Sequence, residues 1–120
     1  MKFKLLLIMV ICSVFGHTQV KEFNTQEITI NSFVDGTLLT PTASETESLA
    51  IIIPGSGPTD RDGNQNFAKS NALKKLAEAL TINRIATFRY DKRIVKQIKQ
   101  GNPNVNILFD DFVTDAISVV

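Results

Sequence analysis

Apolar residues recur along the first half of the chain in a pattern that predicts an edge hairpin followed by a buried strand. Residues 26–30 alternate polar and apolar side chains, as a half-buried strand does. Residues 34–39 hold strand-like flanks around Asp35-Gly36, a dipeptide favoured in tight turns. We expect these two segments to form an antiparallel edge hairpin. Residues 49–53 are apolar without interruption, which is typical of a parallel strand covered on both faces.

Helical spacing follows, and then another strand. Residues 71–80 predict a helix with Ser70 or Asn71 as its N-cap residue. Its apolar face consists of Leu73, Leu76, Ala77 and Leu80. Residues 84–90 predict a strand, and strand, helix and strand in this order predict a right-handed βαβ unit. The predicted sheet is therefore mixed, with a parallel interior.

The last part of the chain predicts a loop and an amphipathic helix. Residues 91–104 are polar and broken by Gly101 and Pro103, so we expect a loop with a short helical turn near residues 95–99. Residues 106–120 predict a helix that places Asp110, Asp111 and Asp115 on its solvated face. Its apolar stripe consists of Phe109, Phe112, Val113, Ala116, Ile117 and Val120. The predicted fold class is α/β.

The first 18 residues have the layout of a secretory signal peptide. Lys2 and Lys4 precede an apolar run, and the small residues Gly16 and Thr18 favour cleavage after Thr18. The run is shorter than the ~20 residues that span a bilayer, so we expect no permanent membrane span. Residues 19–120 are then the mature domain, expected in the periplasm or the medium.

Composition and charge exclude several kinds of site and partner. The 13 basic and 12 acidic residues give a net charge of +1, which becomes −1 without Lys2 and Lys4. Because neither sign dominates, no nucleic-acid surface is predicted. Cys12 and His17 lie in the predicted signal, so the mature domain has no thiol for a disulfide, metal or nucleophile and no imidazole base. A small neutral substrate and no cofactor are expected.

The most informative segment is the glycine-punctuated loop after the buried strand, residues 54–64. Gly55 and Gly57 permit backbone angles and close approaches that a Cβ would forbid. In an open parallel sheet the working site lies beyond the carboxyl ends of the strands, where this loop falls. A dinucleotide loop would need glycine where Asp60 stands, and a P-loop would need a Gly-Lys-Ser/Thr that is absent.

Polar residues near this loop have structural explanations. Alternating oxygen ligands resemble a calcium loop, but the sixth and twelfth places counted from Asp60 hold Gln65 and Asn71 instead of Gly and Glu, so no metal site is predicted. We expect a hydrogen-bonded loop in which Arg61 pairs with a neighbouring carboxylate. Residues 89–93 are expected to be a solvated strand end with salt bridges. The alternating ligands are Asp60, Asp62, Asn64 and Asn66.

Three blocks, residues 55–64, 88–93 and 109–115, occur in an order that resembles the N-terminal part of bacterial secreted α/β-hydrolases of the serine esterase and peptidase-like type. The resemblance implies the N-terminal portion of that fold, with residues 19–120 an incomplete domain. It also implies that the backbone N–H of Ser56 lies in an oxyanion hole. Pro54 stands where the family usually has His, and Ile94-Val95 follow where a glycine commonly comes next.

The rest of the hydrolase machinery is absent from this sequence. No G-x-S-x-G nucleophile elbow occurs, and the mature domain has no histidine, so no catalytic triad is predicted in this chain. We therefore expect a fragment of a serine hydrolase for esters or amides that is inactive by itself. The alternative is a noncatalytic secreted binding or interaction domain derived from the same fold. Ser56 is then a small residue in a tight turn.

Overall fold

A mixed sheet of four strands forms the centre of the computed structural model, which describes residues 22–43, 45–46, 48–102 and 106–120. The predicted signal peptide, 1–18, lies outside the described residues. The strands are β1 (Phe23–Thr29), β2 (Asp35–Pro41), β3 (Leu49–Ile52) and β4 (Ala86–Tyr90), in the spatial order β1-β2-β4-β3. β2 pairs antiparallel with β1 and β4, whereas β3 and β4 are parallel. The α/β class, the edge hairpin and the parallel pairing are confirmed.

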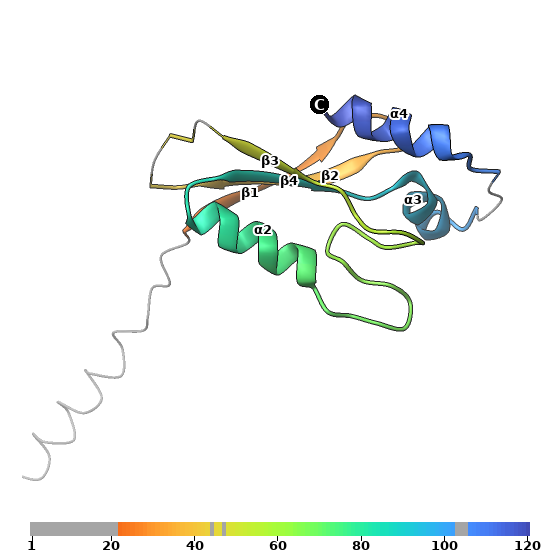
Figure 1. Ribbon diagram of the computed structural model, residues 1–120, viewed down its shortest axis with the longest axis horizontal. Coiled ribbons are helices and arrows are strands. Elements are labelled where there is room, and N and C mark those ends of the chain that lie inside the picture. The colour runs from red at the N-terminus through yellow and green to blue at the C-terminus, as the bar shows by residue number, and fades with distance from the viewer. Residues whose placement is uncertain (1–21, 44, 47, 103–105) are drawn as a thin grey trace, which may run out of the picture.

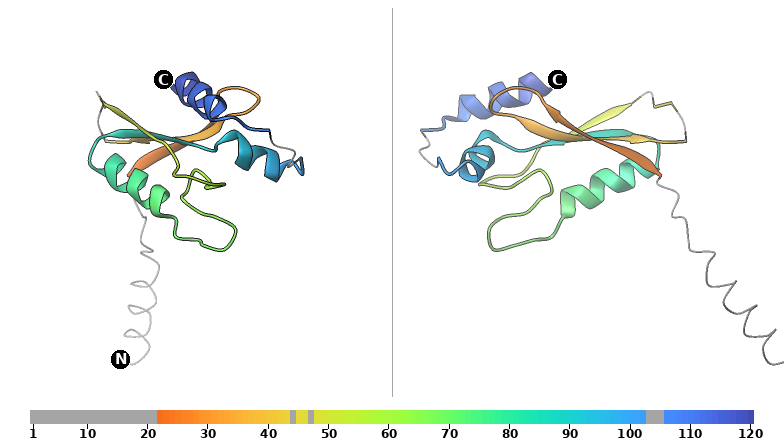
Figure 2. Two further views of the ribbon diagram at one scale, coloured as in Figure 1. Left: turned by 45° about the vertical axis from the view of Figure 1, so that its right-hand side comes forward. Right: turned by 180° about the vertical axis from the view of Figure 1, so that it is seen from behind.

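Helices cover both faces of this sheet (Figures 1 and 2). α2 (Ala72–Ile82) connects β3 to β4 and packs on one face, and α4 (Phe109–Val119) lies on the other. α3 (Arg93–Lys99) follows β4 at the end of the sheet near the loop after β3 (Figure 1). In the described part of the chain, no helix is both long and apolar enough to cross a membrane.

Alternate side chains of β4 face the two helices. Phe88 and Tyr90 pack with Val34 on the α4 face, and Val119 of α4 contacts this cluster. Thr87 points to the α2 face, where its hydroxyl lies 3.1 Å from that of Thr81. The other α2-face cluster consists of Leu39, Ile52 and Ala77. The period-two alternation of a strand thus divides the core into two layers.

Burial of β3 differs from the prediction. Leu49 is 56% exposed and Ile53, just beyond the strand, is 60% exposed, whereas Ile52 is buried. The reason is that β3 is an edge strand of the described sheet and not an interior one. A continuous apolar run does not reveal which strands flank it.

The turn of the hairpin also differs from the prediction. The chain turns between β1 and β2 at Asn31, whose Oδ1 accepts hydrogen bonds from the N–H groups of Phe33 (2.8 Å) and Val34 (3.0 Å). Asp35 and Gly36 belong to β2, so the prediction that they form the turn is wrong. An asparagine side chain that closes a local ring stabilises a turn without glycine.

Gly36 is required by packing, and Gly36→Ala is expected to destabilise the protein. A Cβ at this position would overlap the Phe88 ring and lie 2.9 Å from the carbonyl oxygen of Arg89. Because the neighbouring strand holds both groups, the expected loss is about 1–3 kcal/mol in urea unfolding. Gly55→Ala is the matched control, since a Cβ there meets no atom within 4 Å. Equal stability of the two variants would contradict the packing role.

The start of α3 differs from its prediction, whereas the N-cap of α2 is one of the two residues that the sequence predicted. α3 begins at Arg93, earlier than the turn expected near residues 95–99, and it occupies half of the predicted loop. α2 begins at Ala72, whose N–H donates to the Ser70 hydroxyl at 3.2 Å. Asn71 occupies the N-cap position with a positive φ of 52° and makes no side-chain cap. Asn71 therefore holds the N-cap position, and the Ser70 hydroxyl is the side-chain acceptor for the first N–H of the helix.

Candidate functional site

The loop after β3 is held by a lysine that follows β4. Because β3 and β4 are parallel neighbours, their carboxyl ends meet at one edge of the sheet. Lys92, two residues beyond β4, donates hydrogen bonds from its ammonium group to the carbonyl oxygens of Gly55 and Gly57. It is 8% exposed, and burial lowers the pKa of its ammonium group below the usual value. One side chain therefore fixes the Gly55–Ser56 peptide and the Gly57–Pro58 peptide, on either side of Ser56.

This clamp determines where the N–H of Ser56 points. In a trans peptide the C=O and the next N–H point in opposite directions, and the carbonyl of Gly55 and the N–H of Ser56 share one such peptide. When Lys92 binds that carbonyl, the N–H is directed away from Lys92. This N–H donates no hydrogen bond to any residue that the structure describes, whereas the Ser56 carbonyl accepts one from Thr59 Oγ1 at 2.8 Å. The backbone N–H of Ser56 is thus a hydrogen-bond donor whose direction is fixed by Lys92.

The two glycines of the loop have different roles. Gly57 has a φ of 72°, in the left-handed region that glycine adopts readily, as the sequence predicted. Gly55 is not among the residues of positive φ, and a Cβ there would meet open space. The prediction that Gly55 is needed for backbone freedom or close approach is wrong for this residue.

Ser56 lines an open cavity of about 590 Å³ at the carboxyl ends of β3 and β4. Residues 53–57 form one wall, and Tyr90, Lys92 and Ile94 form another. α4 and the residue before its cap contribute Ile107, Phe109, Phe112 and Asp115. The ammonium nitrogen of Lys92 lies 5.7 Å from the centre of the Phe112 ring. A mainly apolar cavity of this size suits a small organic ligand.

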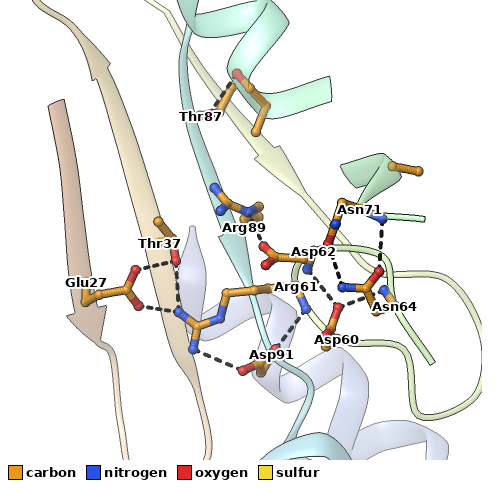
Figure 3. A network of polar contacts seen from close by, with 12 residues as sticks. Glu27, Thr37, Asp60, Arg61, Asp62, Asn64, Asn71, Thr87, Arg89 and Asp91 are labelled. Carbon is orange, nitrogen blue, oxygen red and sulfur yellow. Dashed lines mark hydrogen bonds and ion pairs between the residues drawn. The ribbon is translucent and has the colours of Figure 1, made fainter. Parts of the chain in front are cut away.

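An ion-pair network around the buried Asp91 holds the loop (Figure 3). The guanidinium of Arg61 binds Glu27 at 2.6 Å, Asp91 at 3.0 Å and the Thr37 hydroxyl at 3.0 Å. Asp91 also accepts the backbone N–H of Arg61 at 2.8 Å and the ammonium of Lys99 at 2.8 Å. The predicted pairing of Arg61 with a carboxylate is confirmed, and it ties the loop to β1, β2 and the end of β4.

The alternating oxygen ligands of the loop form hydrogen bonds within the protein. Asp60 Oδ1 accepts the N–H groups of Asp62 (2.9 Å) and Asn64 (2.8 Å), and Asp62 pairs with Arg89 at 2.9 Å. Asn64 and Asn71 exchange two hydrogen bonds, at 2.8 and 2.9 Å (Figure 3). Among the described residues, no three metal-ligating side chains form a group. The hydrogen-bonded loop is confirmed.

The charged residues at the end of β4 are buried, so their predicted solvation is wrong. Arg89, Asp91 and Lys92 are each at most 8% exposed. They extend inward because the loop and α3 fold back over the strand end and supply their counter-charges and carbonyl acceptors. The predicted salt bridges are present.

The predicted solvated face of α4 is also partly wrong. Asp115 is 2% exposed and accepts two hydrogen bonds from Arg93, at 2.8 and 2.6 Å. Asp111 binds the same guanidinium at 2.7 Å. Val113 and Ile117, from the predicted apolar stripe, are exposed instead. The Arg93 ion pairs turn this acidic side of the helix toward the protein.

Tyr90 and Lys92 line the cavity, although the sequence favoured a solvated strand end for residues 89–93. Tyr90 is the last residue of β4, and Lys92 follows it by two residues. The available signal was their position: a residue that follows one parallel strand lies beside the loop that follows its neighbour.

Comparison with known proteins finds no family model, curated protein or solved structure that matches this chain.

Proposed function

We propose that this chain supplies the oxyanion-binding part of a secreted serine hydrolase that acts on an ester or amide. The observation that carries the proposal is the Lys92 clamp, which leaves the Ser56 N–H as a fixed donor beside an apolar cavity. Hydrolysis by acyl transfer develops negative charge on a carbonyl oxygen, and a preorganised N–H donor stabilises that charge. A donor held in place beforehand needs no rearrangement during the reaction.

The same proposal assigns the nucleophile, acid and base to groups that this sequence lacks. Ser56 contributes its backbone and not its hydroxyl, since the mature domain contains no histidine to activate a serine. The chain by itself is therefore expected not to hydrolyse p-nitrophenyl butyrate. Hydrolysis abolished by a serine-directed phosphonate would contradict this assignment.

Butylphosphonate, an anion with tetrahedral oxygens and an apolar tail, tests the donor directly. In the ¹⁵N-labelled full chain, saturation with butylphosphonate is expected to move the Ser56 amide proton downfield, because the N–H then binds an anionic oxygen. Lys92→Met removes the clamp, and we expect a smaller Ser56 shift at saturation and about tenfold weaker binding. An unmoved Ser56 amide in the wild-type chain would overturn the proposal.

Lys75→Met is the matched control, because it removes the same charge from an exposed position on α2. It separates the clamp from the general attraction of an anion to a positive charge. We expect it to leave the Ser56 shift at saturation unchanged. An equal loss in both variants would contradict the specific role of Lys92.

A noncatalytic binding domain is the second candidate, and one observation favours it. Residues of this chain alone line a cavity of about 590 Å³, so a ligand could bind without any acyl-transfer group. The phosphonate experiment separates the two candidates. A binding domain predicts shifts for the cavity residues of α4 while the Ser56 amide stays in place.

A further inference from the structure

Tyr90 places one buried hydroxyl group at the apolar cavity. It is the last residue of β4 and is 1% exposed. Its ring packs with Val34 and Phe88 on the α4 face of the sheet, and the side chain lines the cavity. Tyr90 therefore belongs both to the core cluster and to the lining of the cavity.

The hydroxyl of Tyr90 has no hydrogen-bond partner among the residues that the structure describes. It is also not one of the fully enclosed polar atoms without a partner, which belong to Arg89 and Gln97. Tyr90 lines the cavity, so the cavity is the space in which a partner for this hydroxyl would lie. Because a buried tyrosine hydroxyl usually finds a partner, a molecule in the cavity is the group that would supply one.

The charges nearby favour a neutral ligand. Burial raises the pKa of the Tyr90 phenol, and the negative charge of Asp115 raises it further, so the phenol keeps its proton at neutral pH. Asp115 is already bound through both oxygens to Arg93. Its negative charge still disfavours a second anion beside the phenol. Lys92 is committed to two carbonyl oxygens.

We propose that Tyr90 is a binding residue for a neutral carbonyl compound with an apolar body. Its hydroxyl donates a hydrogen bond to the ligand's carbonyl oxygen, and the hydrocarbon body lies against Ile94, Ile107 and Phe112. The assignment concerns the same cavity as the Ser56 site, but it requires no acyl transfer. It therefore holds for a hydrolase subunit and for a binding domain alike.

The chain contains one tyrosine and no tryptophan, so the phenolate absorbance of the full chain reports Tyr90 alone. Methyl hexyl ketone is a suitable ligand because it is neutral, apolar and not hydrolysable. A hydrogen bond from the neutral phenol to the ketone is lost when the phenol ionises. Saturation with the ketone is therefore expected to move the spectrophotometric titration of Tyr90 to higher pH. An unmoved titration would overturn the proposal.

Tyr90→Phe keeps the ring and removes the hydroxyl. Titrations followed by the amide shifts of α4 are expected to show about threefold to tenfold weaker ketone binding in this variant. Equal ketone affinity in the two chains would overturn the assignment.

The readouts at Tyr90 and Ser56 distinguish this inference from the proposed function. In one outcome, butylphosphonate shifts the Ser56 amide while the ketone leaves the titration of Tyr90 unmoved. This outcome overturns the assignment of Tyr90 and supports the oxyanion role of Ser56. The reverse result supports Tyr90 as a ligand donor and removes the oxyanion role.

Discussion

Replacement of Asp91 by alanine is expected to lower the free energy of unfolding by about 3–5 kcal/mol, because it breaks a buried ion pair on one side only. Asp91 accepts the backbone N–H and the guanidinium of Arg61 and the ammonium of Lys99. Without it, the Arg61 N–H loses its acceptor, and the guanidinium keeps only Glu27 and the Thr37 hydroxyl. Urea unfolding followed by circular dichroism measures the loss without the screening that a guanidinium salt would add.

Glu45→Ala is the matched control for this variant. Glu45 is exposed, and no ion pair to it occurs among the described residues, so the same change of charge is expected to alter stability by less than about 0.5 kcal/mol. A loss of similar size in both variants would show that net charge, and not the network, determines the effect.

Acid provides a second test of the same carboxylate. Burial alone would raise the pKa of Asp91, but hydrogen bonds from Lys99 and Arg61 outweigh it and hold the pKa below the usual 3.8. Because the folded pKa is the lower one, the stabilisation by Asp91 is complete above about pH 4 and is lost as the pH falls further. The difference in free energy of unfolding between the wild-type chain and Asp91→Ala is therefore expected to become smaller below about pH 4. A constant difference would contradict the lowered pKa.

The alternation and the apolar runs predicted the sheet because burial of one strand face leaves a period of two in the sequence. The turn at Asn31 was missed because its side chain closes the loop by hydrogen bonding, and composition alone favoured Asp35-Gly36. Gly36 is explained by the Phe88 ring of β4, a contact between residues far apart in the sequence. Such a contact has no local signal.

The sequence predicted the loop of the candidate site but not the buried charged residues around it, because only the loop has a local signal. Gly57 marked the loop because its positive φ is a local property of the backbone. Lys92 and Asp115 were assigned to solvated faces because charged residues are rarely buried unless paired, and their partners are distant in sequence. Arg93 and the loop carbonyls supply those partners only once β4, α3 and α4 are assembled. Charge patterning therefore fails at this site, where the charges are paired and buried.

Arg93→Met is expected to lower the free energy of unfolding by about 3–5 kcal/mol and to loosen α4. The guanidinium binds Asp115 and Asp111 of α4 and lies 4.8 Å from the centre of the Phe33 ring. Removing it leaves the carboxylate of Asp115, whose side chain is 3% exposed, without its counter-charge. Hydrogen exchange of the α4 amides is expected to accelerate more than that of β4, since exposed apolar residues on α4 contribute little to its attachment.

The double variant Arg93→Met with Asp115→Leu identifies the cause of that loss. If an unpaired buried carboxylate destabilises the single variant, replacing both partners by apolar side chains recovers most of the stability, because no charge remains to be desolvated. If Arg93 acts mainly through Asp111 or the Phe33 ring, the double variant stays as unstable as Arg93→Met. The cavity depends on the same helix, because Phe112 and Asp115 line it. If the double variant regains stability, we therefore expect it to bind the ketone as well. A stable double variant that does not bind the ketone would show that the ion pair sets the position of α4.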